Sequence, residues 1–211
     1  MHAPGFLKLL CFSDLHLDLA AARRIAAKAL VGNIDLLESA GDLGLNGVPD
    51  PELYRVLAKP GVPVLAIPGN HDGDESFERS ITASGWTSID SAVHRHGDFF
   101  IAGHGIRSNP DCGERESEKF LTFAASIEQL PAGRLVLVSH LPPRGSLSAR
   151  DRHFVDRGSP ALADWIRRRQ PVAVICGHVH HREPVIEHVG GTLVVNPGPY
   201  GWLQRLRCSG R

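Results

Sequence analysis

Residues 7–16 read LKLLCFSDLH, an apolar run that is followed at once by an aspartate and a histidine. The apolar part, residues 7–13, has the length and composition of a buried strand, and residues 20–30 have the pattern of an Ala-rich helix. A strand followed by a helix is typical of the βα unit of a parallel sheet. Asp14 and His16 are therefore expected at the C-terminal end of such a strand.

The same arrangement of apolar run and polar ending recurs along the chain. Strands are predicted at residues 34–39, 62–67, 134–139 and 172–176. The polar clusters after them are Gly41-Asp42, Gly69-Asn70-His71-Asp72, His140 and Gly177-His178-Val-His180. Because the C-terminal ends of parallel strands open onto one edge of a sheet, we expect these side chains to meet there. His, Asn and carboxylate donors without cysteine indicate a metalloenzyme rather than a structural zinc knot.

Helices and hairpins are predicted around these strands. Helices are expected over residues 51–57, 76–83, 114–130 and 160–169, and hairpins pair 92–95 with 99–103 and 184–188 with 192–195. Residues 200–207 can supply one edge strand, and residues 144–157 form a long charged loop. Parallel units early in the chain and hairpins later indicate two sheets packed face to face with helices outside.

Composition narrows the class of protein. The 211 residues carry 23 acidic and 23 basic side chains, so no global field favours nucleic acid or an anionic membrane. No apolar stretch approaches the length of a membrane span, and no linker divides the chain, so residues 1–211 are expected to form a single domain. The cysteines have no metal or redox spacing, which suits free thiols in a cytoplasmic protein; they are Cys11, Cys112, Cys176 and Cys208.

The order of the polar clusters resembles the signature of the calcineurin-like metallophosphoesterases. That signature consists of Asp-x-His, Gly-Asp, Gly-Asn-His-Asp/Glu, an isolated His and Gly-His-x-His, and the match covers residues 9–199. The resemblance implies an α/β fold, a four-layer α/β/β/α sandwich of two mixed sheets flanked by helices. It also implies hydrolysis of a phosphomonoester or phosphodiester by a hydroxide that bridges two metals.

The resemblance further implies a set of metal ligands. Asp14, His16 and His180 would bind one ion, Asn70, His140 and His178 the other, and the Asp42 carboxylate would bridge both. This mixture of donors suits two divalent transition metal ions, with Mn, Fe, Zn, Co and Ni all open. The family block that begins at Asp42 usually ends in a second acid, which is absent here; Asn46 is the candidate to replace it.

His71 and Asp72 are the expected catalytic residues. His71 lies next to the ligand Asn70, so it can act as a general acid or as a cation that binds phosphate. Asp72 can accept a hydrogen bond from the His71 imidazole and fix its tautomer. The alternative for Asp72 is that it caps the following helix, and the two roles do not exclude each other.

Arg144 and His153, in the charged loop, are the candidate substrate contacts. Arginine grips phosphate in a bidentate fork, although exposed charges in a loop also serve solubility. His104 is a further candidate for a substrate contact. Asn196-Pro197-Gly198 is expected to form a tight turn.

Three functions remain open. A small phosphate ester is the expected substrate of a two-metal enzyme, whereas its physiological identity and the oligomeric state are left open. A protein-binding scaffold that keeps the fold without catalysis is the first alternative. The second is a nuclease, which the neutral charge makes less favoured because such enzymes need a basic track.

Overall fold

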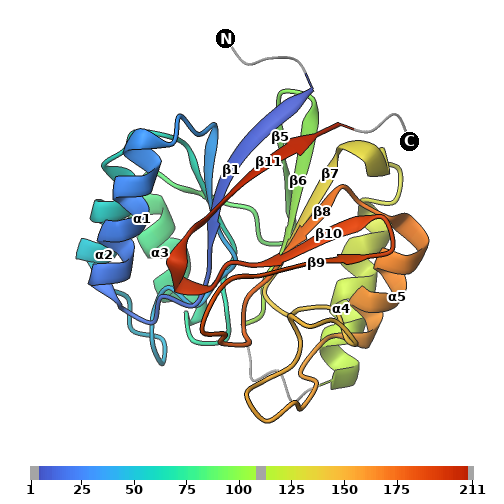
Figure 1. Ribbon diagram of the computed structural model, residues 1–211. Coiled ribbons are helices and arrows are strands. Elements are labelled where there is room, and N and C mark those ends of the chain that lie inside the picture. Colours follow the sequence, from blue (N-terminus) through green and yellow to red (C-terminus); the bar gives the residue numbers. More distant parts are fainter. Residues whose placement is uncertain (1–4, 108–112, 209–211) are drawn as a thin grey trace.

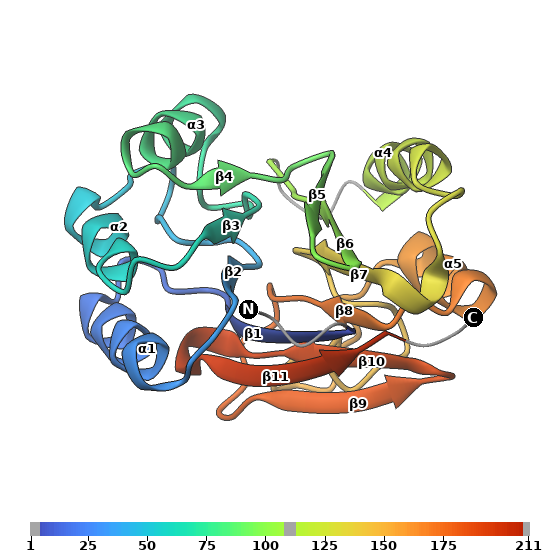
Figure 2. The same ribbon diagram turned by 90° about the horizontal axis from the view of Figure 1, so that it is seen from above.

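The computed structural model describes residues 5–107 and 113–208, which form two β-sheets between two layers of helices (Figures 1 and 2). In Figure 2 the layers follow one another as helices α1 to α3, the first sheet, the second sheet, and helices α4 and α5. This arrangement confirms the four-layer α/β/β/α sandwich expected from the sequence.

The first sheet has the strand order β11-β1-β2-β3-β4. Its strands are β1 (Phe6–Phe12), β2 (Leu36–Ser39), β3 (Val64–Ala66), β4 (Thr87–Ser88) and β11 (Trp202–Arg207). Strands β1 to β4 are parallel, and β11 joins the edge antiparallel to β1. The predicted edge strand within residues 200–207 is therefore confirmed, whereas β4 was not expected because two residues carry no periodic signal.

The second sheet has the order β5-β6-β7-β8-β10-β9. Its strands are β5 (Ala92–His96), β6 (Phe99–His104), β7 (Leu135–Ser139), β8 (Ala173–Ile175), β9 (Val185–Val189) and β10 (Thr192–Asn196). Only the outer strands β5 and β9 are antiparallel, and the four inner strands are parallel. Antiparallel pairing in this sheet is thus limited to the two predicted hairpins, because helices connect β6 to β7 and β7 to β8.

Five α-helices cover the outer faces of the sheets. They are α1 (Leu19–Val31), α2 (Pro51–Ala58), α3 (Asp74–Ala83), α4 (Gly113–Ser126) and α5 (Pro160–Arg169). Helix α5 has a side-chain cap, since the Ser159 side chain accepts a hydrogen bond from the Leu162 amide. Helix α4 ends earlier than residue 130 because Ile127 and Leu130 donate to carbonyls three residues back, which tightens the last turn.

The buried side chains form three apolar layers, one between the sheets and one under each set of helices. These layers arise because successive side chains of a strand point to opposite faces of the sheet. On β1, Leu9 and Cys11 point between the sheets, whereas Leu10 and Phe12 point toward the helices. By the same alternation Glu38 on β2 points between the sheets, where it is fully buried. Neither carboxylate oxygen of Glu38 has a hydrogen-bond partner among the residues that the structure describes, and burial raises the pKa of Glu38 well above the usual value.

Cys11, Cys176 and Cys208 are free thiols, and Cys112 lies outside the described residues. Among residues 5–107 and 113–208, no helix combines the length and apolar character that crossing a membrane requires.

Candidate metal centre

The five polar clusters meet at the C-terminal ends of the inner strands. Asp14 and His16 follow β1, Asp42 follows β2, Asn70 follows β3, His140 follows β7, and His178 and His180 follow β8. Asp14, Asp42 and His178 have positive φ angles of 56°, 56° and 66°. Such angles are rare outside glycine and mark tight turns that point side chains toward a site. Both sheets therefore contribute side chains to one place.

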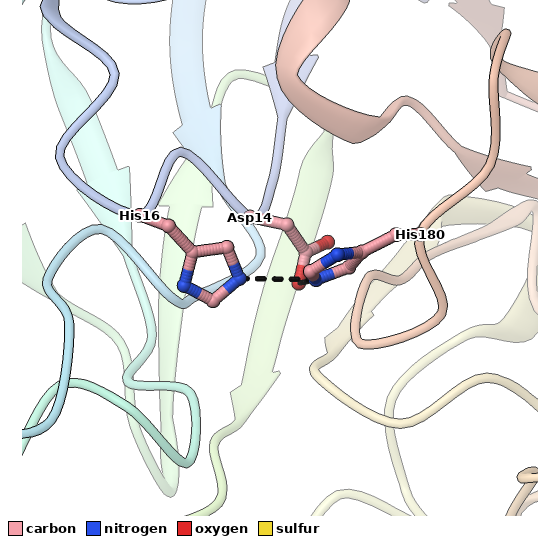
Figure 3. A group of neighbouring side chains, drawn as sticks. All are labelled: Asp14, His16 and His180. Atoms are coloured by element: carbon pink, nitrogen blue, oxygen red, sulfur yellow. Dashed lines mark hydrogen bonds and ion pairs between the residues drawn. The ribbon is translucent and has the colours of Figure 1, made fainter.

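Asp14, His16 and His180 form the first group of converging donors (Figure 3). Their ligand atoms lie within 4.8 Å of one another. The His16 and His180 Nε2 atoms are 3.0 Å apart, and His180 Nε2 lies 3.6 Å from an Asp14 carboxylate oxygen. Asp14 is buried and His180 is exposed, so the group opens to solvent on one side.

Asn70, His140 and His178 form the second group. The Asn70 Oδ1 atom lies 3.1 Å from both His140 Nε2 and His178 Nδ1. His140 Nδ1 donates a hydrogen bond to the Ala40 carbonyl at 2.7 Å, which fixes the ring orientation and directs Nε2 at the group.

The Asp42 carboxylate lies between the two groups. Its Oδ2 atom is 3.4 Å from His140 Nε2 and 3.7 Å from His16 Nε2, while Oδ1 accepts the His71 backbone amide at 2.8 Å. Burial acts to raise the pKa of Asp42, but His140 and the His71 amide lower it to about 2. Burial disfavours the charged form of His140, yet Asp42 raises the pKa of His140 to about 9. Metal binding at this imidazole would therefore displace a proton.

Glycine is required at positions 69 and 177 because atoms of neighbouring loops lie too close to leave room for a Cβ atom. A Cβ atom on Gly69 would collide with the Asp42 carboxylate, and one on Gly177 would collide with the Ser13 hydroxyl. The Gly177 position would also bring a Cβ within 2.7 Å of an Asp14 carboxylate oxygen. These two glycines let loops from different strands come together around the carboxylates.

The Asp72 carboxylate accepts hydrogen bonds from backbone amides of the site loops rather than from the His71 imidazole. This buried carboxylate accepts the backbone amides of Asp42, Gly44 and Gly69 at 2.8, 2.7 and 2.8 Å. The cap expected from the sequence is also not made, because α3 begins after Gly73 without a side-chain cap. Burial raises the pKa of Asp72 to about 6.

His71 and Asn46 occupy different surroundings. The His71 imidazole is half-buried and packs edge-on against the His16 ring with 5.0 Å between ring centroids. Asn46 lies exposed in the turn between Leu45 and Val48, with a φ of 52°. It therefore does not replace the missing second acid of the family block as a support for Asp42. Asp72 supplies that support through the Asp42 amide.

Asn196 and Ser13 support the site in ways that the sequence pattern did not indicate. The buried Asn196 side chain accepts the Gly198 amide, as the expected turn requires, but it also donates to the carbonyls of Gly177 and Val179 at 3.3 and 2.9 Å. It therefore holds the loop that carries His178 and His180. The Ser13 hydroxyl donates to the Asp14 carboxylate at 2.5 Å.

Comparison with known proteins identifies the family. Residues 7–207 match the model of the calcineurin-like phosphoesterase superfamily domain. The chain belongs to this family.

A phosphodiesterase and a phosphatase occur among its relatives and structural neighbours. A probable glycerophosphodiester phosphodiesterase, GpdQ, of Arcobacter nitrofigilis is 29% identical over 154 residues, which are 69% of this chain and 56% of that protein. The chain thus spans about half the length of this curated relative. The protein TT1561 of Thermus thermophilus shares the fold with a TM-score of 0.71, 16% identity, and coverage of 96% of this chain and 99% of that one. A dimetal phosphatase from Danio rerio has a TM-score of 0.59 and 10% identity, covering 94% and 89%.

The donors of this calcineurin-like phosphoesterase fit a pair of divalent metals. Two imidazole nitrogens at about 2.0–2.1 Å from one ion, at an angle near 90°, lie about 3.0 Å apart. The His16 and His180 Nε2 atoms have this separation. The donor groups found in the described part of the chain contain histidine and aspartate without cysteine, and Asn70 adds an amide oxygen. Such donors suit first-row transition metals and leave their identity open.

A cavity of about 1140 Å³ lies beside the metal donors. His178 and His180 line one end of it, and Arg144, His153 and His104 line other parts. The structure therefore brings both predicted substrate contacts, and the additional candidate His104, to a cavity that reaches the metal donors.

Proposed function

We propose that the chain is a metal-dependent phosphoesterase that hydrolyses a phosphomonoester or phosphodiester with two divalent ions. The observation that carries this proposal is the position of Asp42, whose Oδ2 atom lies between His140 Nε2 and His16 Nε2. Each of these histidines belongs to a different donor group, so a single carboxylate can serve both ions.

The proposed ligands follow the two donor groups. Asp14, His16 and His180 hold one ion, Asn70, His140 and His178 hold the other, and Asp42 is shared. Two such ions, when bound, would lower the pKa of a shared water to supply hydroxide near neutral pH and would draw charge from the phosphoryl oxygens.

The protein side chains supply binding, support and a proton. His71, whose ring packs against the ligand His16, donates a proton to the leaving oxygen or binds the phosphate as a cation. Asp72 keeps the Asp42 and Gly69 amides together, which holds the bridging carboxylate beside the Asn70 turn. Arg144 and His153 contact the organic part of the substrate from the cavity wall.

The relatives support this chemistry. The Arcobacter nitrofigilis relative is named as a probable phosphodiesterase, which favours a diester among the two ester classes. The Danio rerio neighbour is named as a dimetal phosphatase, which agrees with two ions in this fold.

The test is a panel of generic monoesters and diesters run with several divalent metals. Turnover that requires metal and prefers one ester class supports the proposal and identifies the preferred ion. Two bound ions without turnover on any ester would contradict it and favour a protein-binding scaffold. Cleavage of DNA or RNA that weakens steeply with salt would instead indicate a nuclease.

We also propose a cytoplasmic location, because the described cysteines are unpaired. Fractionation of the native host cells, with detection of the protein by antibody, tests this location. Recovery outside the cytoplasm would contradict it.

A further inference from the structure

The segment 144–158 forms one wall of the cavity, called here the loop wall, and its backbone is firmly held. The Arg144 amide donates to the Ser159 carbonyl at 3.0 Å. Gly158 packs so closely beside it that a Cβ there would lie 2.5 Å from the Arg144 nitrogen. The start of the loop wall is therefore fixed against α5, although the Arg144 side chain itself is exposed to the cavity.

The acidic groups of the loop wall are already engaged by the loop itself. The Asp151 carboxylate accepts the amides of His153 and Val155 at 2.8 and 3.0 Å. The Asp156 carboxylate accepts the amides of Gly145 and Gly158 at 2.8 and 2.9 Å. These hydrogen bonds shape the wall and orient its carboxylates toward the backbone.

Two of the loop-wall cations that line the cavity have no carboxylate partner in the described part of the chain. Arg157 pairs with Asp151 at 3.2 Å, but Arg144 forms no ion pair and Arg152 donates only to the His153 ring at 3.1 Å. Within residues 5–107 and 113–208, the loop wall therefore presents to the cavity positive charge that no carboxylate pairs with.

Another part of the cavity wall, on α4, has a different character. Glu116 pairs with Lys119 at 2.8 Å, and Glu118 is exposed and lines the cavity. Phe120 adds an apolar surface next to the His104 ring, which is only 7% exposed. An anionic ligand would avoid this acidic side and lie against the arginines.

We propose that the loop wall binds a second anionic group, carried by the part of the substrate remote from the scissile phosphate. This inference rests on the proposed function, since the scissile phosphate is taken to lie at the metal donors. The cavity of about 1140 Å³ exceeds what a phosphate group alone would fill and reaches the size of pockets for whole organic ligands. Arg144 is the main contact because its backbone is held while its guanidinium forms no ion pair with any residue that the structure describes.

A set of matched synthetic diesters tests the inference. Each is a p-nitrophenyl alkyl phosphodiester, with alkyl chains of increasing length that end in either a phosphonate or a methyl group. Water attacks phosphorus, the bond to the aryl oxygen breaks, and p-nitrophenolate leaves, so both series report the same step. The terminal phosphonate has no ester bond and acts only as the second anion.

The terminal anion should raise kcat/KM by about 10- to 100-fold at the chain length that reaches the loop wall, as expected for charged hydrogen bonds. Arg144→Ala should abolish this gain, so that the phosphonate and methyl series react alike, and Arg144→Lys should restore part of it. Arg150→Ala is the matched control, because Arg150 is an exposed cation of the same loop that does not line the cavity.

Two results would overturn the inference: a wild-type protein that shows no gain at any length, or Arg144→Ala that slows both series by the same factor. Calorimetry with alkyl bisphosphonates and alkyl monophosphonates on the metal-loaded protein measures the same preference without turnover. A metal-loaded protein that hydrolyses neither series and no phosphomonoester would contradict the proposed function instead. Tighter calorimetric binding of the bisphosphonates than of the monophosphonates would then still support the inference, and equal binding would contradict it.

Discussion

The Nε2 atoms of His16 and His180 face each other at 3.0 Å beside the Asp14 carboxylate, although the two residues are 164 positions apart in the chain (Figure 3). The first strand of one sheet and an inner strand of the other sheet carry them. Two imidazole nitrogens so close to a carboxylate favour a shared cation, because a cation satisfies all three donors at once. The two-sheet arrangement therefore brings the proposed metal ligands together.

Asp42→Asn should lower turnover by about 100-fold or more, because a neutral amide cannot balance the charge of two ions. The near-identical shape of asparagine should keep the change in free energy of unfolding to about 1 kcal/mol in the metal-free protein. Steady-state kinetics and urea unfolding measure the two effects. Wild-type turnover in this variant would refute the bridging role.

His71→Ala should slow hydrolysis by about 10²- to 10⁴-fold, the usual contribution of a general acid. Both ions should remain bound, because the backbone amide of His71, which the variant keeps, is the group that contacts Asp42. Elemental analysis of the purified variant checks the metal content. Loss of one ion would show that the His71 imidazole is a ligand.

Asp72→Ala should lower the free energy of unfolding by about 3 kcal/mol or more, since three buried amides lose their acceptor. Urea unfolding of the metal-free protein measures this change. The sequence-based alternative, an orienting bond to His71, predicts little loss of stability and a shifted pH profile of kcat/KM. That second outcome would contradict the contacts seen here.

Glu38→Gln should remove a pH dependence of stability. Burial raises the pKa of Glu38 above its ordinary value of 4.5, so above that pH the unfolded chain is ionised while the folded chain keeps its proton. Stability of the wild-type protein therefore falls as pH rises, by up to about 1.4 kcal/mol per pH unit, until the folded-state pKa is passed.

Urea unfolding of wild type and Glu38→Gln at about pH 5 and about pH 8 measures the difference between the two proteins. The variant should gain stability relative to wild type as the pH rises. Parallel pH profiles for the two proteins would mean that Glu38 titrates normally in the folded state.

The sequence pattern predicted the sandwich and the convergence of metal donors, because both follow from apolar runs and the residues directly after them. It could not predict the contacts of Asp72 or Asn196. Their partners are backbone amides and carbonyls of other loops, such as Gly44, which is 28 residues from Asp72. A pattern of side chains does not indicate which backbone groups of other loops will lie near a given side chain in the folded protein.

The direct test of the two-metal account is a crystal structure of the protein grown with manganese and measured for anomalous scattering. The account predicts two anomalous peaks, one among Asp14, His16 and His180 and the other among Asn70, His140 and His178, with the Asp42 carboxylate in contact with both. A single peak, or two peaks of which Asp42 contacts neither, would contradict it.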